Sequence, residues 1–194
     1  MAAGLGIRMF PLTRNMPKPL IKVHGKPMIE TVIEALLRRR INKIVVVVGY
    51  LGEQFKYLKV KYPCVQILKN PYYNKVNNIS SVFVARNILK EEDCFICEAD
   101  LLISDPTIFD VELNNSCYFG KMVLKHSDDW VFDIDDAGYI CRVGKVGDNC
   151  YNMVGVSYFT KSDATILAEA IEHAYKQPGY ETQFWDDVVN NNLN

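Results

Sequence analysis

Residues 43–48 read KIVVVV, and from Ile44 to Val48 the run contains no polar residue. An apolar, β-branched run without alternation is typical of a strand that is covered on both faces, as in a parallel sheet. The segments on either side of this run, residues 26–40 and 51–61, have helical periodicity. The run therefore predicts a buried parallel strand between two helices.

The same alternation continues along the chain. Residues 65–68 and 94–97 have the composition of strands, and residues 77–89, 163–176 and 182–190 have that of helices. Residues 117–158 differ, because they contain short β-like segments and a DDAG turn at 135–138 that is typical of a hairpin. We predict an α/β fold with a mixed, mostly parallel sheet, helices on both faces and a small β-rich insertion, all in one domain of residues 1–194.

The charge balance is close to neutral. The chain has 22 basic and 23 acidic residues, a net charge of -1, and 49% hydrophobic residues. This balance provides no electrostatic basis for binding nucleic acid or a membrane surface. We also expect no membrane span and no signal peptide, because no stretch approaches the ~20 apolar residues that a span requires.

The six cysteines, at positions 64, 94, 97, 117, 141 and 150, lie among apolar neighbours. This usage is typical of reduced thiols in a cytoplasmic protein. Cys94 and Cys97 form a CxxC, but residues three apart on a strand point to opposite faces, so we interpret them as packing residues. The three histidines have no metal-ligand spacing.

The first twenty residues, MAAGLGIRMFPLTRNMPKPL, contain a glycine-rich loop. Gly4 and Gly6 would allow main-chain N–H groups to approach a polyphosphate closely, while Arg8 and Lys18 would add positive charge. The stretch is not a Walker A loop, which requires GK[ST]. Taken alone, it favours an ordinary glycine turn with two solvated cations.

The longer string AAGxGxR, PLT, PKPL and GKPMIE resembles the signature of the nucleoside-triphosphate transferases that activate sugar phosphates and alcohol phosphates. Later stretches are most similar to bacterial choline-phosphate cytidylyltransferases of the LicC type. These stretches are VVGYLGEQFKYLK, NPYYNKVNNISSVFVAR, EADLLIS, DDW, GVSYF and QFWDDVV. The resemblance implies a Rossmann-like nucleotidyltransferase fold.

The resemblance also implies a set of site residues. Lys18 and Arg8 would be catalytic, and Asp100 and Asp186 would bind Mg²⁺. The implied nucleotide-binding residues are Ala2, Ala3, Gly4, Gly6, Arg8, Lys18, Gly49, Tyr50, Asn78 and Ser81. The implied acceptor-binding residues are Trp130, Asp129, Phe184 and Trp185, because aromatic faces and carboxylates recognise a quaternary ammonium group.

Each of these sites has an alternative interpretation. The EAD at 98–100 also fits a solvated strand end, the NNISS at 77–81 also fits helix capping, and each tryptophan also fits a packing role. For the whole chain, the resemblance implies transfer of CMP from CTP to phosphocholine. The alternatives are phosphoethanolamine, 2-aminoethylphosphonate or a sugar 1-phosphate as acceptor, or a nucleotide-binding protein without catalysis.

Relatives in this family carry a hydrophobic strand before AAG and usually a further strand and helix after FWDD. The printed sequence has neither, so we expect a mis-set start or a truncation. A central position for that strand predicts apolar edges on its two neighbours.

Overall fold

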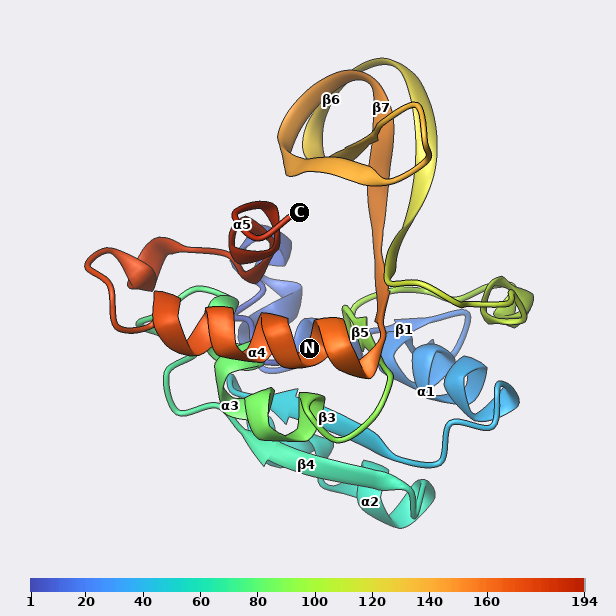
Figure 1. The fold of residues 1–194 in the computed structure, drawn as a ribbon. Helices are drawn as coiled ribbons and strands as arrows, with labels where there is room; N and C mark the ends of the chain where they lie inside the picture. Colours follow the sequence, from blue (N-terminus) through green and yellow to red (C-terminus); the bar gives the residue numbers. More distant parts are fainter. Residues whose placement is uncertain (194) are drawn as a thin grey trace.

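The structure is a computed structural model that describes residues 1–193. It consists of an α/β body and a long two-stranded arm that rises from it (Figure 1). The strands are β1 (Lys22–Val23), β2 (Lys26–Pro27), β3 (Ile44–Val48), β4 (Val65–Lys69), β5 (Cys94–Cys97), β6 (Cys117–Ile134) and β7 (Ile140–Phe159). The α-helices are α1 (Met28–Arg38), α2 (Tyr57–Lys61), α3 (Ile79–Leu89), α4 (Lys161–Ala174) and α5 (Trp185–Asn190).

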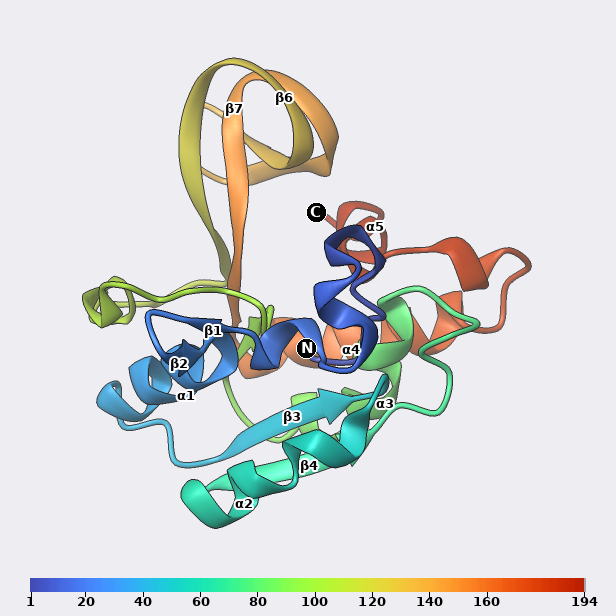
Figure 2. The same cartoon turned by 180° about the vertical axis from the view of Figure 1, so that it is seen from behind.

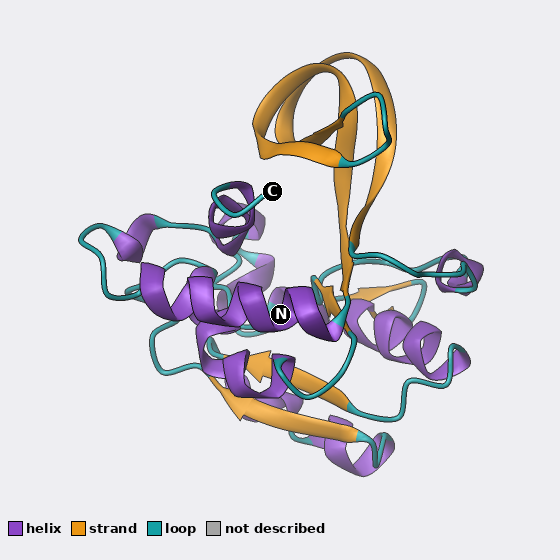
Figure 3. Ribbon diagram, in the orientation of Figure 1, coloured by secondary structure: helices purple, strands orange, loops and turns teal. Residues whose placement is uncertain are grey.

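The predicted strand at 44–48 is confirmed as β3, which pairs in parallel with β4 from Ile44 opposite Val65 to Val48 opposite Lys69. Its side chains are almost all buried, as its uninterrupted apolar sequence predicts. Helices lie on both sides of this pair in Figure 3. The α/β class and the mixed sheet are therefore confirmed.

Several predicted helices begin later than expected or are interrupted. The predicted helix at 26–40 begins only at Met28, because Lys26 and Pro27 pair as β2 with β1. The predicted helix at 51–61 consists of a 3-10 turn, Gly52–Phe55, followed by the short α2. The predicted helix at 182–190 is the shorter α5, preceded by a 3-10 turn at Tyr180–Thr182.

A separate three-stranded sheet is antiparallel, in the order β5-β7-β6. The β-like region has nearly the predicted bounds, but it consists of two long strands rather than short segments. β6 and β7 have 18 and 20 residues and curl upon themselves through register shifts. The predicted hairpin turn at 135–138 is confirmed. Gly138 has a φ of +86° and its N–H donates to the Asp135 carbonyl at 3.0 Å.

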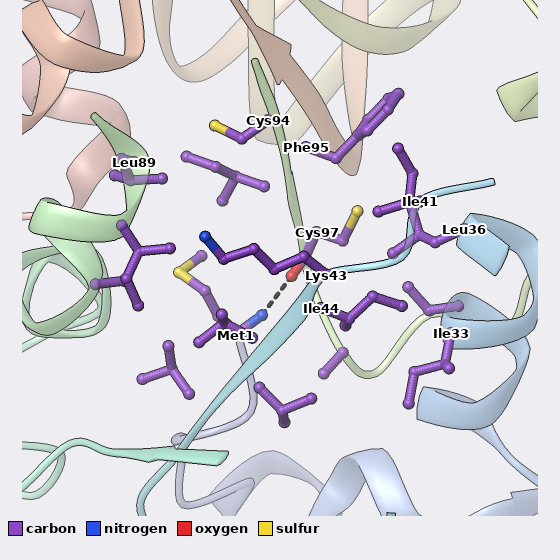
Figure 4. A pocket seen from close by; sticks show the side chains of 18 of the residues that line it. Met1, Ile33, Leu36, Ile41, Lys43, Ile44, Leu89, Cys94, Phe95 and Cys97 are labelled. Atoms are coloured by element: carbon purple, nitrogen blue, oxygen red, sulfur yellow. Dashed lines mark hydrogen bonds between the residues drawn. The ribbon is translucent and has the colours of Figure 1, made fainter. Parts of the chain in front are cut away.

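Residues 1–3 lie between β3 and β5. The Ala2 N–H donates to the Val47 carbonyl at 2.8 Å on one side, and the Ala99 N–H donates to the Met1 carbonyl at 3.0 Å on the other. The Met1 ammonium donates to the Cys97 carbonyl (Figure 4). Three residues thus occupy a central position in the sheet, where the sequence predicts a whole strand.

Next to Met1, a cavity of about 450 Å³ lies between β3 and β5 and is lined by all three. Ile33 and Leu36 of α1 lie on one side of it and Leu89 of α3 lies on the other (Figure 4). Apolar side chains of β3 and β5 line this cavity, as expected from the apolar edges that the sequence analysis predicts on these strands. β5 is consequently only half-buried.

A second group of buried side chains joins α3, α4 and α5 to the base of the arm. Trp185 of α5 is 4% exposed and stacks on Tyr118 of β6, with ring centroids 5.9 Å apart. This packing fixes α5 close to the N-terminal loop, and the views from both sides agree on this placement (Figures 1 and 2). Over residues 1–193, no helix is both long enough and apolar enough to cross a bilayer.

Candidate functional site

A cleft of about 700 Å³ opens where the N-terminal loop, the carboxyl end of β5, the start of α3, the arm and α5 meet. This position, beyond the carboxyl ends of sheet strands, is where open α/β sheets bind ligands. The predicted site residues that line it are Ala3, Gly4, Arg8, Lys18, Asn78, Ser81, Asp100, Asp129, Trp130, Phe184, Trp185 and Asp186. Residues from both ends of the chain are thus brought to one surface.

Four other predicted nucleotide-binding residues do not line this cleft. Ala2 and Gly6 line a smaller adjoining cavity of about 340 Å³. Gly49 and Tyr50 lie outside both cavities and support the loop from behind. The Tyr50 hydroxyl donates to the Arg14 carbonyl at 2.7 Å, so contact of Gly49 and Tyr50 with a nucleotide stays a prediction.

The glycine loop makes a tight turn and leaves its main chain open to a ligand, as its sequence suggests. Gly6 has a φ of +66°, and the Thr13 hydroxyl donates to its carbonyl at 2.8 Å, which holds the turn. A Cβ placed on Gly4 would find no atom within 4 Å, so the main chain there faces open space. The loop can therefore present its backbone to a ligand in the cleft.

Lys18 and Asp100 form an ion pair in the cleft. Their side chains are 31% and 26% exposed, so solvent reaches both. Lys18 comes from the 3-10 turn Lys18–Leu20, and Asp100 follows β5. A cation and a carboxylate that are paired in this way can exchange partners when a phosphate enters.

Asp186 is buried beneath this pair, and only 5% of its surface is exposed. Burial, followed by the nearby Glu98 carboxylate, raises the pKa of Asp186 to about 7. The Tyr118 hydroxyl donates to Asp186 Oδ1 at 3.2 Å. Burial likewise raises the pKa of Glu98, with a further contribution from Asp100. The site therefore concentrates negative charge at its base.

These carboxylates fit a magnesium ion that arrives with a nucleotide. Mg²⁺ in such sites takes one or two carboxylates and fills its other positions with phosphate oxygens and water. Within residues 1–193, no three His, Cys, Asp or Glu side chains are arranged as a metal cluster. Burial and then the Glu98 carboxylate raise the pKa of Asp186, and a divalent cation beside these groups would favour the ionised carboxylate.

At the start of α3, Asn78 and Ser81 make hydrogen bonds within the protein and also line the cleft. The Asn78 side-chain oxygen accepts a hydrogen bond from the main-chain N–H of Trp185 at 3.1 Å, which ties α3 to α5 rather than capping α3. The Ser81 hydroxyl accepts from the Asn70 amide at 3.2 Å and is buried. Both residues also line the cleft, so their contact with a nucleotide stays a prediction.

The predicted acceptor residues have different environments. Trp130 and Phe184 face each other at an angle of 64°, with ring centroids 5.2 Å apart, and both are half-buried at the cleft. The main-chain N–H of Trp130 donates to the Asp129 carboxylate at 2.8 Å. Trp185 lines the same cleft but packs mainly on Tyr118 and Phe159.

Asn70, Tyr118 and Lys145 contact predicted site residues and were absent from the sequence prediction. Asn70, fully buried, bonds to Ser80 and Ser81 of α3. Tyr118 bonds to Asp186, and Lys145 lies over the rings of Trp130 and Phe184. The place of Asn70 directly after β4, at the carboxyl end of a parallel strand, is a signal that could have identified it. Tyr118 and Lys145 carry no such local signal.

Comparisons with known proteins agree with this geometry. A family model for nucleotidyl transferases matches residues 1–116, more than half of the chain. The chain is 55% identical over 193 residues to the 2-aminoethylphosphonate cytidylyltransferase of Lancefieldella rimae, which covers all of this chain and 78% of that protein. It is 32% identical over 199 residues to the choline-phosphate cytidylyltransferase of Streptococcus pneumoniae, covering all of this chain and 82% of that protein.

Among solved structures, CTP:phosphocholine cytidylyltransferase from Streptococcus pneumoniae superposes with a TM-score of 0.86 at 32% identity. The match covers 98% of this chain and 82% of that one. An apo UDP-glucose pyrophosphorylase shares the fold, with a TM-score of 0.73 at 15% identity, 98% of this chain and 84% of that one. By its sequence match and its fold, this chain belongs to the nucleotidyl transferase family.

Proposed function

We propose that this protein is a cytidylyltransferase that transfers CMP from CTP to 2-aminoethylphosphonate, releasing pyrophosphate. The observation that carries this proposal is the 55% identity, along the whole chain, to a 2-aminoethylphosphonate cytidylyltransferase. Identity to the choline-phosphate enzymes is 30–32%. The comparisons therefore support the alternative acceptor of the sequence analysis better than phosphocholine, its main reading.

In this proposal the glycine loop binds the triphosphate of CTP. Main-chain N–H groups at Gly4 would approach the phosphates, and Lys18 and Arg8 would supply positive charge. Asn78 and Ser81, at the other side of the cleft, would contact the ribose or base. The cleft volume of about 700 Å³ is in the range of small-molecule sites.

The reaction requires no general base in the protein. An oxygen of the acceptor's phosphonate, which is already ionised to a large extent near neutral pH, attacks the α-phosphorus of CTP. A new P–O bond forms, the bond between the α-phosphorus and the bridging oxygen breaks, and pyrophosphate leaves with that electron pair. Lys18 would stabilise the charge that develops on the phosphates.

Asp100 and Asp186 would hold Mg²⁺ when the nucleotide is bound. The ion would supply charge neutralisation between the phosphates and this acidic part of the cleft. Lys18, which pairs with Asp100 in the free protein, would then turn toward the phosphates. The acceptor's ammonium group would lie near Trp130, Phe184 and Asp129, where aromatic faces and a carboxylate both favour a cation.

The test is an acceptor screen. Purified protein is incubated with CTP, Mg²⁺ and one acceptor at a time, and pyrophosphate release is measured with 2-aminoethylphosphonate, phosphoethanolamine, phosphocholine and glucose 1-phosphate. We expect the highest kcat/KM with 2-aminoethylphosphonate. A higher kcat/KM with phosphocholine would overturn the choice of acceptor. Binding of CTP without release from any acceptor would favour a non-catalytic nucleotide-binding protein.

A pair of tryptophan variants tests the acceptor site. Trp130→Ala is expected to raise KM for the acceptor about tenfold while leaving KM for CTP within about twofold, because the ring lies beside Phe184 at the cleft. Trp185→Ala is the comparison variant. It is expected to lower the thermal midpoint by removing a buried ring at a cost of about 3–5 kcal/mol. Equal losses for both substrates in Trp130→Ala would indicate a packing role instead.

A further inference from the structure

Lys145 projects from β7 onto the two rings of the acceptor site. It is the cross-strand partner of Trp130 in the β6–β7 ladder. Its Nζ lies 4.1 Å from the ring centroid of Phe184 and 5.4 Å from that of Trp130. Both distances are within the ≈ 6 Å over which an ammonium is attracted to an aromatic face.

The two rings are the main attraction for this ammonium. Among residues 1–193, no Asp or Glu oxygen lies within the 4.0 Å salt-bridge distance of Lys145 Nζ. The Lys145 side chain is exposed and sits on a long stem, so it can leave the rings without disturbing the fold. The ring pair therefore already holds a primary ammonium, and this ammonium belongs to the protein.

We propose that Lys145 is a specificity-determining residue, which competes with the acceptor's cationic group for the faces of Trp130 and Phe184. This proposal rests on the proposed function, since it requires an acceptor with a cationic nitrogen. The lysine must be displaced before an acceptor nitrogen can use both rings. For every acceptor that needs the rings, the apparent Kd is the intrinsic Kd divided by the fraction of time for which Lys145 leaves the rings free.

Competition with Lys145 affects a trimethylammonium group more than a primary ammonium group. A trimethylammonium group has no N–H and gains its short-range contact from the rings alone. A primary ammonium can also donate hydrogen bonds to a carboxylate, and the exposed Asp129 carboxylate lines the same cleft. Lys145 thus disfavours phosphocholine more than 2-aminoethylphosphonate. From the strength of a cation–π contact, we expect Lys145 to weaken binding of a trimethylammonium acceptor by between about twofold and about thirtyfold.

The first experiment measures both acceptors with Lys145→Met, which keeps the length of the side chain and removes its charge. We expect kcat/KM for phosphocholine to rise by at least about threefold relative to that for 2-aminoethylphosphonate, through KM, with KM for CTP unchanged. Lys145→Arg retains a cation that stacks on aromatic rings and is expected to keep the original ratio. Lys121→Met removes an exposed lysine from β6 outside the cleft and controls for net charge.

The second experiment requires no catalysis. Tryptophan fluorescence is titrated with tetramethylammonium chloride, against sodium chloride at the same ionic strength, in the original protein and in Lys145→Met. Tighter binding of tetramethylammonium by Lys145→Met supports the competition. An unchanged acceptor ratio together with unchanged tetramethylammonium binding overturns it, as does weaker binding in Lys145→Met.

The two readouts separate this proposal from the proposed function. If no acceptor releases pyrophosphate, the proposed function fails, but the tetramethylammonium titration still decides whether Lys145 covers a cation site. If pyrophosphate is released and both readouts are insensitive to Lys145→Met, the proposed function stands and the role of Lys145 is refuted.

Discussion

Lys18→Ala is the substitution that bears most directly on how the cleft works. Lys18 lies at the carboxyl end of β5, paired with Asp100, and the buried Asp186 and half-buried Glu98 carboxylates lie in the same cleft. Removing this ammonium leaves a site of carboxylates that must receive a triphosphate and an anionic acceptor. We therefore expect catalysis to suffer far more than folding.

The expected loss in kcat can be worked out from the exposure of Lys18 and Asp100. Both side chains are about a quarter to a third exposed, so an effective dielectric constant near 20 applies, and a unit charge about 4 Å from a phosphate oxygen contributes about 4 kcal/mol. This value agrees with the ~10²–10³ loss in kcat found when one donor to a developing charge is removed. By contrast, a partly exposed ion pair contributes only about 0–1 kcal/mol to stability.

The assay is pyrophosphate release at saturating CTP, combined with thermal unfolding of the same preparations. Lys18→Ala is expected to lose about 10²–10³ in kcat, with a thermal midpoint lowered by at most about 4 °C. Lys22→Ala, in the exposed part of β1, removes the same charge outside the cleft and is expected to retain activity. A kcat for Lys18→Ala within tenfold of the unmodified protein, with both variants folded, would refute the assignment of Lys18.

Three further predictions concern the framework of the site. Gly49→Ala is expected to destabilise the protein by about 1–3 kcal/mol in denaturant unfolding, because a Cβ there would lie 2.5 Å from Cβ of Tyr73, whereas Gly4→Ala should leave stability unchanged. Two hydrogen bonds lower the pKa of Asp93, first the one from the main-chain N–H of Lys161 and then the one from the Tyr158 hydroxyl. The Asp93 carboxylate therefore stabilises the fold above the unfolded-state pKa of ~4, and this contribution disappears as pH falls through the lowered folded-state pKa. Asp93→Asn should therefore lower the thermal midpoint more at pH 7 than at pH 3, and an equal difference at both values would contradict this account. Four valines joined before Met1 should fill the cavity between β3 and β5, raise the thermal midpoint and slow amide exchange in β3, whereas four serines should do neither.

Local patterns were sufficient to predict most elements of the body. The apolar run at 44–48 predicts β3, and the Gly138 turn predicts the hairpin of the arm, because each depends on a few adjacent side chains. Helix ends were less predictable. Met28 begins α1 two residues late because Lys26 and Pro27 are paired with β1, and this contact is not visible in the helical pattern.

The N-terminal loop, the acidic residues and the aromatic residues were identified from the sequence through a family resemblance. Only the tertiary structure shows which of them share the cleft. Gly49 supports the loop from behind while Asn78 joins α3 to α5, since each side chain's surroundings come from segments far apart in the chain.

By itself, the sequence determined the α/β class and the presence of a glycine-rich N-terminal loop, because periodicity and glycine placement act over short distances. The tertiary structure decided which residues from distant segments of the chain are in contact. It placed Tyr118 on Asp186 and Lys145 on the rings of Trp130 and Phe184. Such pairings depend on the register of β6 against β7 and on the packing of α5, and neither is encoded in any one stretch of residues.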